Sequence, residues 1–245
     1  MPRSRKIGPA VLVAVCFLAV FSAGTVYGYF LHRNHLFPYR LLNPIRTQSI
    51  RAQSDPWQSG WFRGRYAAIS AFPVHADVVM LGDSLTEWAD WRAILPGIDV
   101  TNQGIAGDTT VGLLSRLDLA NRASPRVVAL MIGVNDLVSL QPVDDVSTRY
   151  AKAIGELAAP GRCIIVQSTL LTRQGATLNA EISDLNQRLA QTCADGRCSF
   201  VDLNAMLAPE GELATDATVD GIHLTARGYT LWRNALLPHI SACHH

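Results

Sequence analysis

The sequence predicts an α/β domain of three layers (α/β/α), in which a parallel sheet of five strands lies between two layers of helices. Hydrophobic residues make up 49% of the 245, enough for a large core, and charged residues only 17%. Short runs rich in Val and Ile alternate with segments whose apolar residues recur at helical spacing. Strands and helices that alternate in this way form right-handed βαβ units, so a parallel sheet is expected.

The expected strands are short, buried and rich in β-branched residues. They cover residues 76–81, 98–102, 126–132, 163–168 and 199–202. The expected helices cover residues 61–72, 111–121, 146–157, 178–193 and 226–240. Pro73 ends the first of these helices, because proline cannot continue the helical hydrogen-bond pattern.

A long apolar run opens the chain. Residues 7–31 contain no Asp, Glu, Lys, Arg or His. A bilayer core about 30 Å thick is crossed by roughly 20 apolar helical residues, so a transmembrane anchor is expected. A cleaved signal with a mediocre site at Ser22-Ala23-Gly24 and a buried helix are the alternatives. The chain then divides into a membrane anchor or signal (1–32), a juxtamembrane linker (33–58) and a folded domain (59–245).

Charge is distributed unevenly along the chain. The formal net charge is +1, but the seven Lys and Arg that precede Asp55 have no acidic residue among them. From Asp55 onward, fourteen Lys and Arg face twenty Asp and Glu, a net charge of −6. Binding along a phosphate backbone needs a concentrated basic face, so the domain is not expected to bind nucleic acid.

The cysteines bear on the cellular compartment. Cys193 and Cys198 bracket a turn-forming stretch, and a local disulfide there fits an oxidising compartment. Two reduced thiols are the alternative, and zinc is disfavoured because no further Cys or His pair has ligand spacing. The folded domain is therefore expected on the exported side, periplasmic or extracellular, anchored or secreted after cleavage. A cytoplasmic domain behind the same anchor is the competing interpretation.

Four polar segments are expected at one edge of the predicted sheet. They cover residues 82–87, 102–110, 133–136 and 220–223. The carboxyl ends of parallel strands meet at one edge of a sheet, where active sites collect. Together the segments supply a hydroxyl (Ser84), an imidazole (His223) and, three residues before it, a carboxylate (Asp220). An imidazole can take the proton of a serine hydroxyl, and a carboxylate can orient the imidazole, so this set suits nucleophilic acyl transfer.

These segments resemble the SGNH/GDSL hydrolase superfamily. The resemblance covers residues 57–240 and rests on Leu81-Gly-Asp-Ser-Leu-Thr-Glu, Asn102-Gln-Gly-Ile-Ala-Gly-Asp-Thr-Thr, Gly133-Val-Asn-Asp and Asp220-Gly-Ile-His-Leu-Thr-Ala-Arg-Gly-Tyr, in that order. They look closest to the branch with the platelet-activating-factor acetylhydrolase catalytic subunits and many bacterial esterases. The resemblance implies a five-stranded parallel sheet in flavodoxin-like order. No Gly-x-Ser-x-Gly elbow occurs, which disfavours the other large serine-esterase fold.

The resemblance also implies roles for individual residues. Ser84 would be the nucleophile, and its backbone N–H would face the oxyanion. Gly107 would offer a second backbone N–H, and Asn135 a side-chain amide N–H. His223 would act as general base and then general acid, with Asp220 holding its ring.

Several residues in or near these segments could instead have structural roles. Asp83 and Asp136 are expected to support the strand ends by accepting hydrogen bonds from loop N–H groups. Gly107 could instead supply a positive φ, and Ser84 taken alone could be a helix cap. Trp88 and Trp91 either line an acyl pocket or pack against the sheet.

The predicted function is that of a serine ester hydrolase with a covalent acyl-enzyme intermediate. Its substrate would be an acyl or acetyl ester of a small molecule, a glycan or a lipid, with specificity in the loop at residues 169–176. No metal and no organic cofactor is implied. The alternatives are an acyltransferase that uses the same intermediate and a non-catalytic module that binds a ligand.

Overall fold

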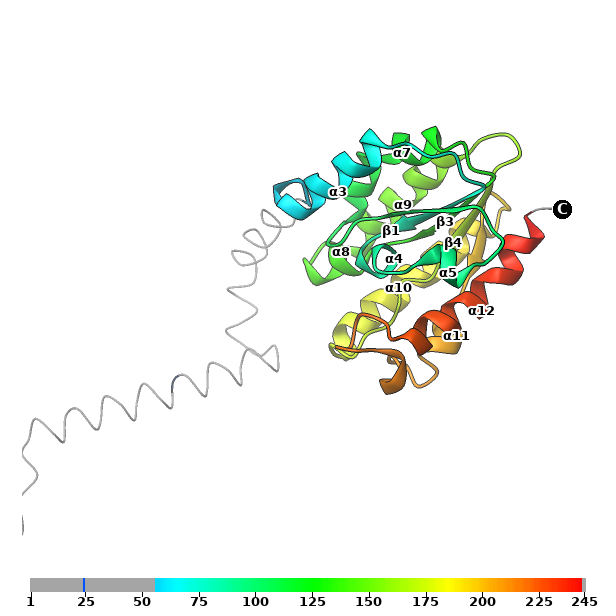
Figure 1. The fold of residues 1–245 in the computed structure, drawn as a ribbon. Coiled ribbons are helices and arrows are strands. Elements are labelled where there is room, and N and C mark those ends of the chain that lie inside the picture. Colours follow the sequence, from blue (N-terminus) through cyan, green and yellow to red (C-terminus); the bar gives the residue numbers. More distant parts are fainter. Residues whose placement is uncertain (1–23, 25–55, 244–245) are drawn as a thin grey trace, which may run out of the picture. The chain divides into compact units, whose positions relative to one another are not determined.

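The computed structural model describes Gly24 and residues 56–243, and every structural statement below concerns these residues (Figure 1). Five parallel strands form one sheet in the order β2-β1-β3-β4-β5. They are β1 (Val78–Gly82), β2 (Val100–Gly104), β3 (Val127–Met131), β4 (Cys163–Gln167) and β5 (Ser199–Val201). The predicted parallel sheet of five strands is thus confirmed, although β1 and β2 run on to the glycines that follow their expected ends.

The helices lie on both faces of this sheet (Figure 1). In chain order they are α3 (Gly60–Ala71), α4 (Ser84–Glu87), α5 (Trp91–Ile94), α6 (Thr110–Leu114), α7 (Leu117–Arg122), α8 (Val134–Val138), α9 (Val143–Leu157), α10 (Ala176–Cys193), α11 (Asn204–Leu207) and α12 (Ala226–Ala242). Two 3₁₀ helices, η1 (Pro56–Gln58) and η2 (Thr215–Ala217), accompany them. The three-layer architecture is therefore confirmed.

Because successive side chains of each strand point to opposite faces, the sheet has a hydrophobic core on each face. In β1, Val79 and Leu81 pack with α6, α7, α9 and α10, whereas Val78 and Met80 pack with α4, α5, α11 and α12. Successive side chains of a strand point to opposite faces, so a strand that is apolar throughout is buried on both. All five residues of β1 are buried, as this arrangement requires.

The predicted helix at residues 111–121 is two short helices. α6 ends before Ser115, and Arg116 leaves helical geometry with φ −133° before α7 begins. The guanidinium of Arg116 turns into the protein and is fully buried there. Apolar spacing indicated the helical segments but carried no information about this interruption.

The predicted fold class needs one correction, because it included an N-terminal transmembrane helix. Within the described residues, none of the helices combines the length and apolarity that crossing a bilayer takes. The predicted span, residues 7–31, lies outside the described residues except for Gly24. The fold class is therefore corrected to the three-layer domain alone, and the predicted boundaries at residues 32 and 58 stay predictions.

Two disulfides join cysteines of the domain. Cys193 and Cys198 are bonded across the turn that separates α10 from β5, as predicted. A second disulfide joins Cys163, at the start of β4, to Cys243, at the end of α12, over a sequence separation of 80. The sequence did not reveal this pairing, because only the tertiary fold brings the chain's last helix to that strand.

Glycines end β1 and β2 because other chain segments approach them closely. A Cβ placed on Gly104 would lie 2.3 Å from the backbone nitrogen of Glu87 in α4. A Cβ on Gly82 would lie 2.2 Å from the carbonyl oxygen of Met131. Real Cβ atoms do not approach backbone atoms so closely, so α4 rests directly on the end of β2.

Replacing Gly104 by Ala is expected to lower the free energy of unfolding by at least about 2 kcal/mol, because α4 would have to move away from β2. Gly155→Ala in α9 is the matched control, since no atom outside its own stretch of helix lies within 4 Å of its added Cβ. That variant is expected to keep its stability or gain up to about 1 kcal/mol from helix propensity. Urea denaturation of both variants checks the difference, and equal losses would contradict the close approach.

Candidate active site

The predicted serine and histidine meet at the carboxyl edge of the sheet. β1 ends at Gly82, and Asp83 is the N-cap of the next helix, α4. Ser84 is the first residue of α4. His223 comes from the loop between η2 and α12, 139 residues further along the chain. Ser84 Oγ lies 3.1 Å from His223 Nε2, within hydrogen-bond distance.

The second ring nitrogen of His223 contacts the predicted carboxylate. His223 Nδ1 lies 2.6 Å from Asp220 Oδ2. The side chain of Ser84 is nearly buried, that of His223 is about one fifth exposed, and that of Asp220 is half exposed. Hydroxyl, imidazole and carboxylate therefore form one hydrogen-bonded series that runs from the sheet edge toward solvent.

The loop that carries Asp220 and His223 is held by its own hydrogen bonds. Asp220 Oδ1 accepts from the backbone N–H groups of Ile222 (2.9 Å) and His223 (2.8 Å), and Gly221 has φ +91°. Burial raises the pKa of Asp220, but the hydrogen bonds from the ring and backbone of His223 and the backbone of Ile222 outweigh it and lower the pKa to about 2. The carboxylate is thus ionised throughout the neutral range.

A second loop supports this one. In the segment between β4 and α10, the backbone N–H of Arg173 donates to Gly221 O (2.8 Å), and Gln174 Nε2 donates to Asp220 O (3.3 Å). The loop at residues 169–176, predicted to determine specificity, therefore contacts the backbone of the loop that carries the carboxylate and the imidazole.

The two tryptophans that follow Ser84 have different environments. Trp91 is buried and packs edge-on against Trp232, with the ring centroids 5.0 Å apart. Trp88 is 55% exposed, and its indole stacks on the imidazole of His223 at 4.1 Å and 30°. Of the two sequence interpretations, packing therefore holds for Trp91, whereas Trp88 covers one face of the imidazole. Sequence reasoning had not linked Trp88 to His223.

The other predicted donors lie on the loop after β2 and at the start of α8. The exposed Gly107 has φ +77° and sits in the turn closed by a hydrogen bond from Asp108 N to Ile105 O (3.1 Å). Asn135 Nδ2 donates one hydrogen bond to the carbonyl oxygen of Asp108 (2.9 Å). Asn135 thus contacts the residue that follows Gly107, and its amide carries a second N–H.

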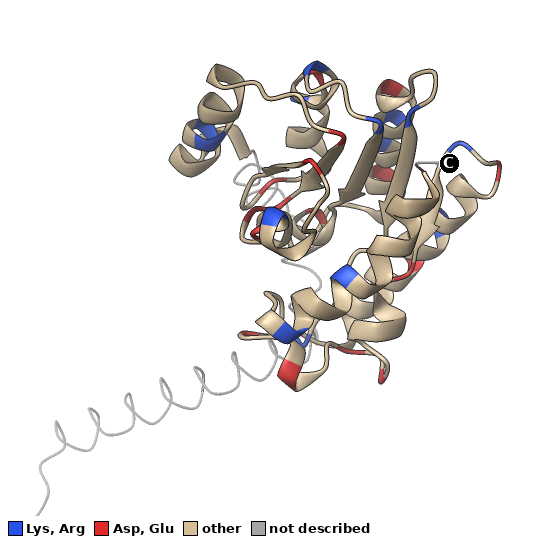
Figure 2. Cartoon of the chain, turned by 45° about the vertical axis from the view of Figure 1, so that its right-hand side comes forward, with Lys and Arg blue, Asp and Glu red and all other residues tan. Residues whose placement is uncertain are grey.

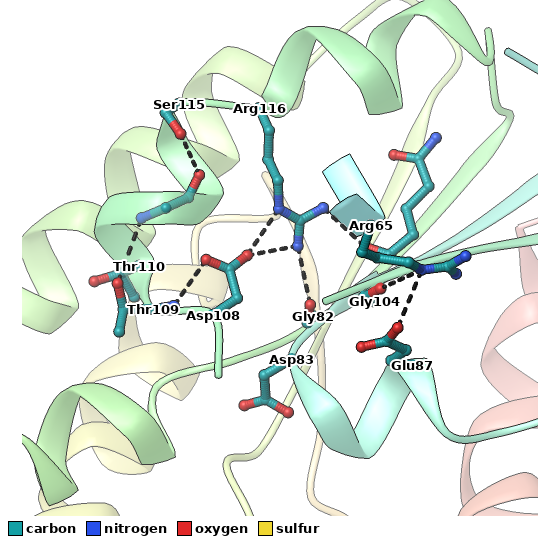
Figure 3. Close-up of polar contacts among 12 residues, drawn as sticks. Arg65, Gly82, Asp83, Glu87, Gly104, Asp108, Thr109, Thr110, Ser115 and Arg116 are labelled. Carbon is teal, nitrogen blue, oxygen red and sulfur yellow. Dashed lines mark hydrogen bonds and ion pairs between the residues drawn. The ribbon is translucent and has the colours of Figure 1, made fainter. Parts of the chain in front are cut away.

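A buried ion pair lies beneath this loop (Figure 3). Arg116 Nη2 lies 2.6 Å from Asp108 Oδ2, and both side chains are fully buried. The same guanidinium donates to Gly82 O (2.9 Å) and Gln103 O (2.7 Å), at the ends of β1 and β2. Sequence reasoning missed Arg116 because nothing in a helical apolar pattern marks a single arginine as buried.

The two predicted supporting aspartates are buried close to this pair. Asp83 Oδ1 accepts from Leu85 N (3.0 Å), and its Oδ2 has no hydrogen-bond partner among the described residues. Asp136 accepts from both the backbone N–H and the hydroxyl of Thr110 (2.9 and 2.6 Å), and Arg149 is also in contact with it. Both carboxylates thus accept backbone N–H bonds next to strand ends.

Burial of these acids changes their protonation. Desolvation raises the pKa of Asp83 from 3.8 to about 7, despite the Leu85 hydrogen bond, and Asp108 and Asp136 add to the rise. Desolvation also raises the pKa of Asp108 to about 6 against the pull of Arg116. The folded domain therefore binds protons more tightly at these sites than the unfolded chain does.

Asp83→Asn tests this protonation. Because the folded-state pKa is raised, the stabilisation by protonated Asp83 is complete below about pH 3.8 and is lost as the pH rises through about 7. Relative to the wild type, the variant is expected to gain about 1–4 kcal/mol in unfolding free energy between pH 4 and pH 8. Urea denaturation at several pH values measures this, with Asp118→Asn in an exposed ion pair as control. Parallel pH profiles for the wild type and Asp83→Asn would refute the raised pKa.

Comparison with known proteins assigns the family. Residues 80–231 match the model of the GDSL-like lipase/acylhydrolase family, which covers more than half of the chain. The chain belongs to this family.

Solved structures share the fold. A GDSL-like lipase from Bacteroides thetaiotaomicron has a TM-score of 0.64 and 23% identity, over 73% of this chain and 97% of that one. A Streptococcus pneumonia protein that carries the name platelet activating factor has a TM-score of 0.63 and 22% identity, over 73% and 90%. The acetylxylan esterase Axe2 from Geobacillus stearothermophilus has a TM-score of 0.58 and 18% identity, over 69% and 96%. At these identities the likeness establishes the fold.

Curated relatives match over a shorter part of their length. N-acylneuraminate cytidylyltransferases from Streptococcus agalactiae are 27% identical over 155 residues. This match covers 63% of this chain but 36% of theirs, so the chain spans about a third of the relatives it matches.

Proposed function

We propose that this hydrolase cleaves acyl esters through Ser84, His223 and Asp220 by way of an acyl-enzyme. The observation that carries the proposal is the hydrogen-bonded series from Ser84 Oγ through both ring nitrogens of His223 to Asp220, at 3.1 and 2.6 Å. A serine hydroxyl becomes an effective nucleophile when an oriented imidazole accepts its proton. Asp220, ionised at neutral pH, orients the ring and stabilises the imidazolium that forms.

The reaction has two halves. In the first, His223 Nε2 takes the proton of Ser84 as Oγ bonds to the acyl carbon; the tetrahedral intermediate then breaks its bond to the leaving alcohol, which receives that proton. In the second, His223 takes a proton from water, the hydroxide attacks the acyl-enzyme, and Ser84 recovers its proton as the carboxylic acid leaves. The tetrahedral intermediate of each half places negative charge on the former carbonyl oxygen.

Three N–H groups would bind that oxyanion. We assign this role to the backbone N–H groups of Ser84 and Gly107 and to the free side-chain N–H of Asn135. The hydrogen bond that Asn135 makes to Asp108, next to Gly107, supports a common site for the last two. Donors placed before the reaction stabilise developing charge without the cost of reorganising solvent.

The substrate we propose is a small acyl ester, above all an acetyl ester, of a sugar or a similar alcohol. The leaving alcohol must lie beside His223 Nε2 to receive its proton, and Trp88 presents a partly exposed aromatic surface against that ring. The names of acetylxylan esterase Axe2 and of the N-acylneuraminate relatives also favour a carbohydrate. Figure 2 shows acidic and basic residues interspersed over the described elements.

Ser84→Ala tests the function directly. The wild type is expected to hydrolyse p-nitrophenyl acetate and to take one fluorophosphonate label per chain, on Ser84, whereas Ser84→Ala should do neither. His223→Ala should lose nearly as much activity, since the two residues act as a unit. Ser147→Ala on the exposed face of α9 is the control and should keep full activity. A wild type that neither turns over esters nor takes the label would refute the proposal.

We also propose that the domain works in an oxidising, exported compartment. The two disulfides support this, because cytosolic thiols are kept reduced. Peptide mass mapping of protein isolated from its native cell without reductant should find Cys163 linked to Cys243 and Cys193 linked to Cys198. Four free thiols in that preparation would contradict the proposal.

A further inference from the structure

We infer that Glu87 is a positioning residue for the oxyanion donor of Gly107, and that α3 is part of the same support. The inference rests on the proposed function, since it concerns the same oxyanion site. Glu87 is the last residue of α4, the helix that begins with Ser84. It therefore lies on the element that carries the nucleophile and can connect that element to the loop with the second donor.

The carboxylate of Glu87 binds three groups from two other segments. Oε2 accepts from the backbone N–H of Ala106 (2.5 Å) and from Trp61 Nε1 (3.1 Å). Oε1 lies 3.3 Å from Arg65 Nε, and the Glu87 side chain is only 8% exposed. A carboxylate with this many donors and this little water is held in one orientation, because any rotation would break charge-assisted hydrogen bonds.

The bond to Ala106 acts on the proposed donor. Ala106 directly precedes Gly107, so the N–H of Gly107 belongs to the peptide group that joins the two residues. Gly107 has φ +77° and no atom within 4 Å of its Cβ position, so side-chain packing does not restrain it. The hydrogen bond from Ala106 N to Glu87 is therefore a restraint one residue away from the donor, in addition to the hydrogen bond from Asp108 N to Ile105 O that closes the turn.

The backbone on both sides of Glu87 is fixed as well. Asn102 Nδ2 lies within 3.0 Å of the carbonyl oxygens of Thr86, Glu87 and Ala89, and Asn102 Oδ1 accepts from Gly104 N (2.9 Å). The bonds to Thr86 and Glu87 satisfy C-terminal carbonyls of α4, which a four-residue helix cannot satisfy internally. Together with the contact of Gly104, they hold α4 and the end of β2 as one unit.

Helix α3 completes this unit from outside the family match. Arg65 pairs with Glu87 and also donates to the carbonyl oxygen of Gly104 (3.3 Å) (Figure 3). It donates as well to the carbonyl oxygen of Asn102 (3.1 Å). Trp61, from the same helix, supplies the third donor to Glu87. The family match begins at residue 80, whereas α3 ends at Ala71, so this helix lies outside the matched segment.

Glu87→Ala is the test. It should lower kcat for p-nitrophenyl acetate by about 10-fold or more, because the donor of Gly107 becomes mobile, while KM changes less than about twofold. The rate of fluorophosphonate labelling should fall in parallel but still reach one label per chain, which shows that the variant is folded. Glu87→Gln keeps an acceptor for Ala106 N–H and should restore most of kcat.

Controls separate positioning from stability. Glu156→Ala removes an exposed glutamate of an ion pair on α9 and should leave kcat unchanged. Arg65→Met keeps the bond between Glu87 and Ala106 and should lower kcat by about threefold. Unchanged kcat in Glu87→Ala with only a lower melting temperature would overturn the inference. If Glu87→Ala does not fold, unchanged kcat in Arg65→Met overturns it.

The outcome is distinguishable from failure of the proposed function. A wild type that neither hydrolyses the ester nor takes the label on Ser84 refutes that function before any Glu87 variant is compared. A wild type that does both, together with fully active Glu87 and Arg65 variants, refutes only the positioning role.

Discussion

The site depends on a buried charge that the fold must neutralise. The guanidinium of Arg116 is inaccessible to water and bonds to Asp108, Gly82 O and Gln103 O. Removing one partner of a buried ion pair typically costs about 3–5 kcal/mol, because the other charge is left uncompensated. Arg116 therefore connects the ends of β1 and β2 to the loop of the proposed oxyanion donor. The helix expected over residues 111–121 is interrupted at this arginine.

The short helix α4 connects this buried framework to the reacting groups. Its N-cap Asp83 faces inward, Ser84 faces His223, Glu87 binds the loop of the proposed oxyanion donor, and Trp88 stacks on the imidazole. Four side chains within six consecutive positions therefore lie around one site. Such a helix has almost no stability of its own. Its geometry comes from the bonds that Asn102 makes to its carbonyl groups and that its own Glu87 makes to Ala106 and α3.

Much of the fold followed from local patterns. Apolar runs and helical spacing predicted the five parallel strands and the longer helices, because periodic burial is written directly into the order of the residues. The family motifs predicted which serine, histidine and carboxylate come together. The transmembrane helix was predicted from a long apolar run, residues 7–31, which lies outside the described residues except for Gly24, and none of the described helices could span a membrane.

The sequence by itself determined the sheet, its parallel connections and the residues at its carboxyl edge, since each depends on neighbours within a few positions. Only the tertiary structure decided that Arg116 is buried, that Trp88 covers His223, that Glu87 binds Ala106, and that Cys163 bonds to Cys243. In none of these cases does the sequence around the residue indicate its environment or its partner. Their partners come from distant segments of the chain, and the local residue pattern does not show which distant segments lie close together in the folded protein.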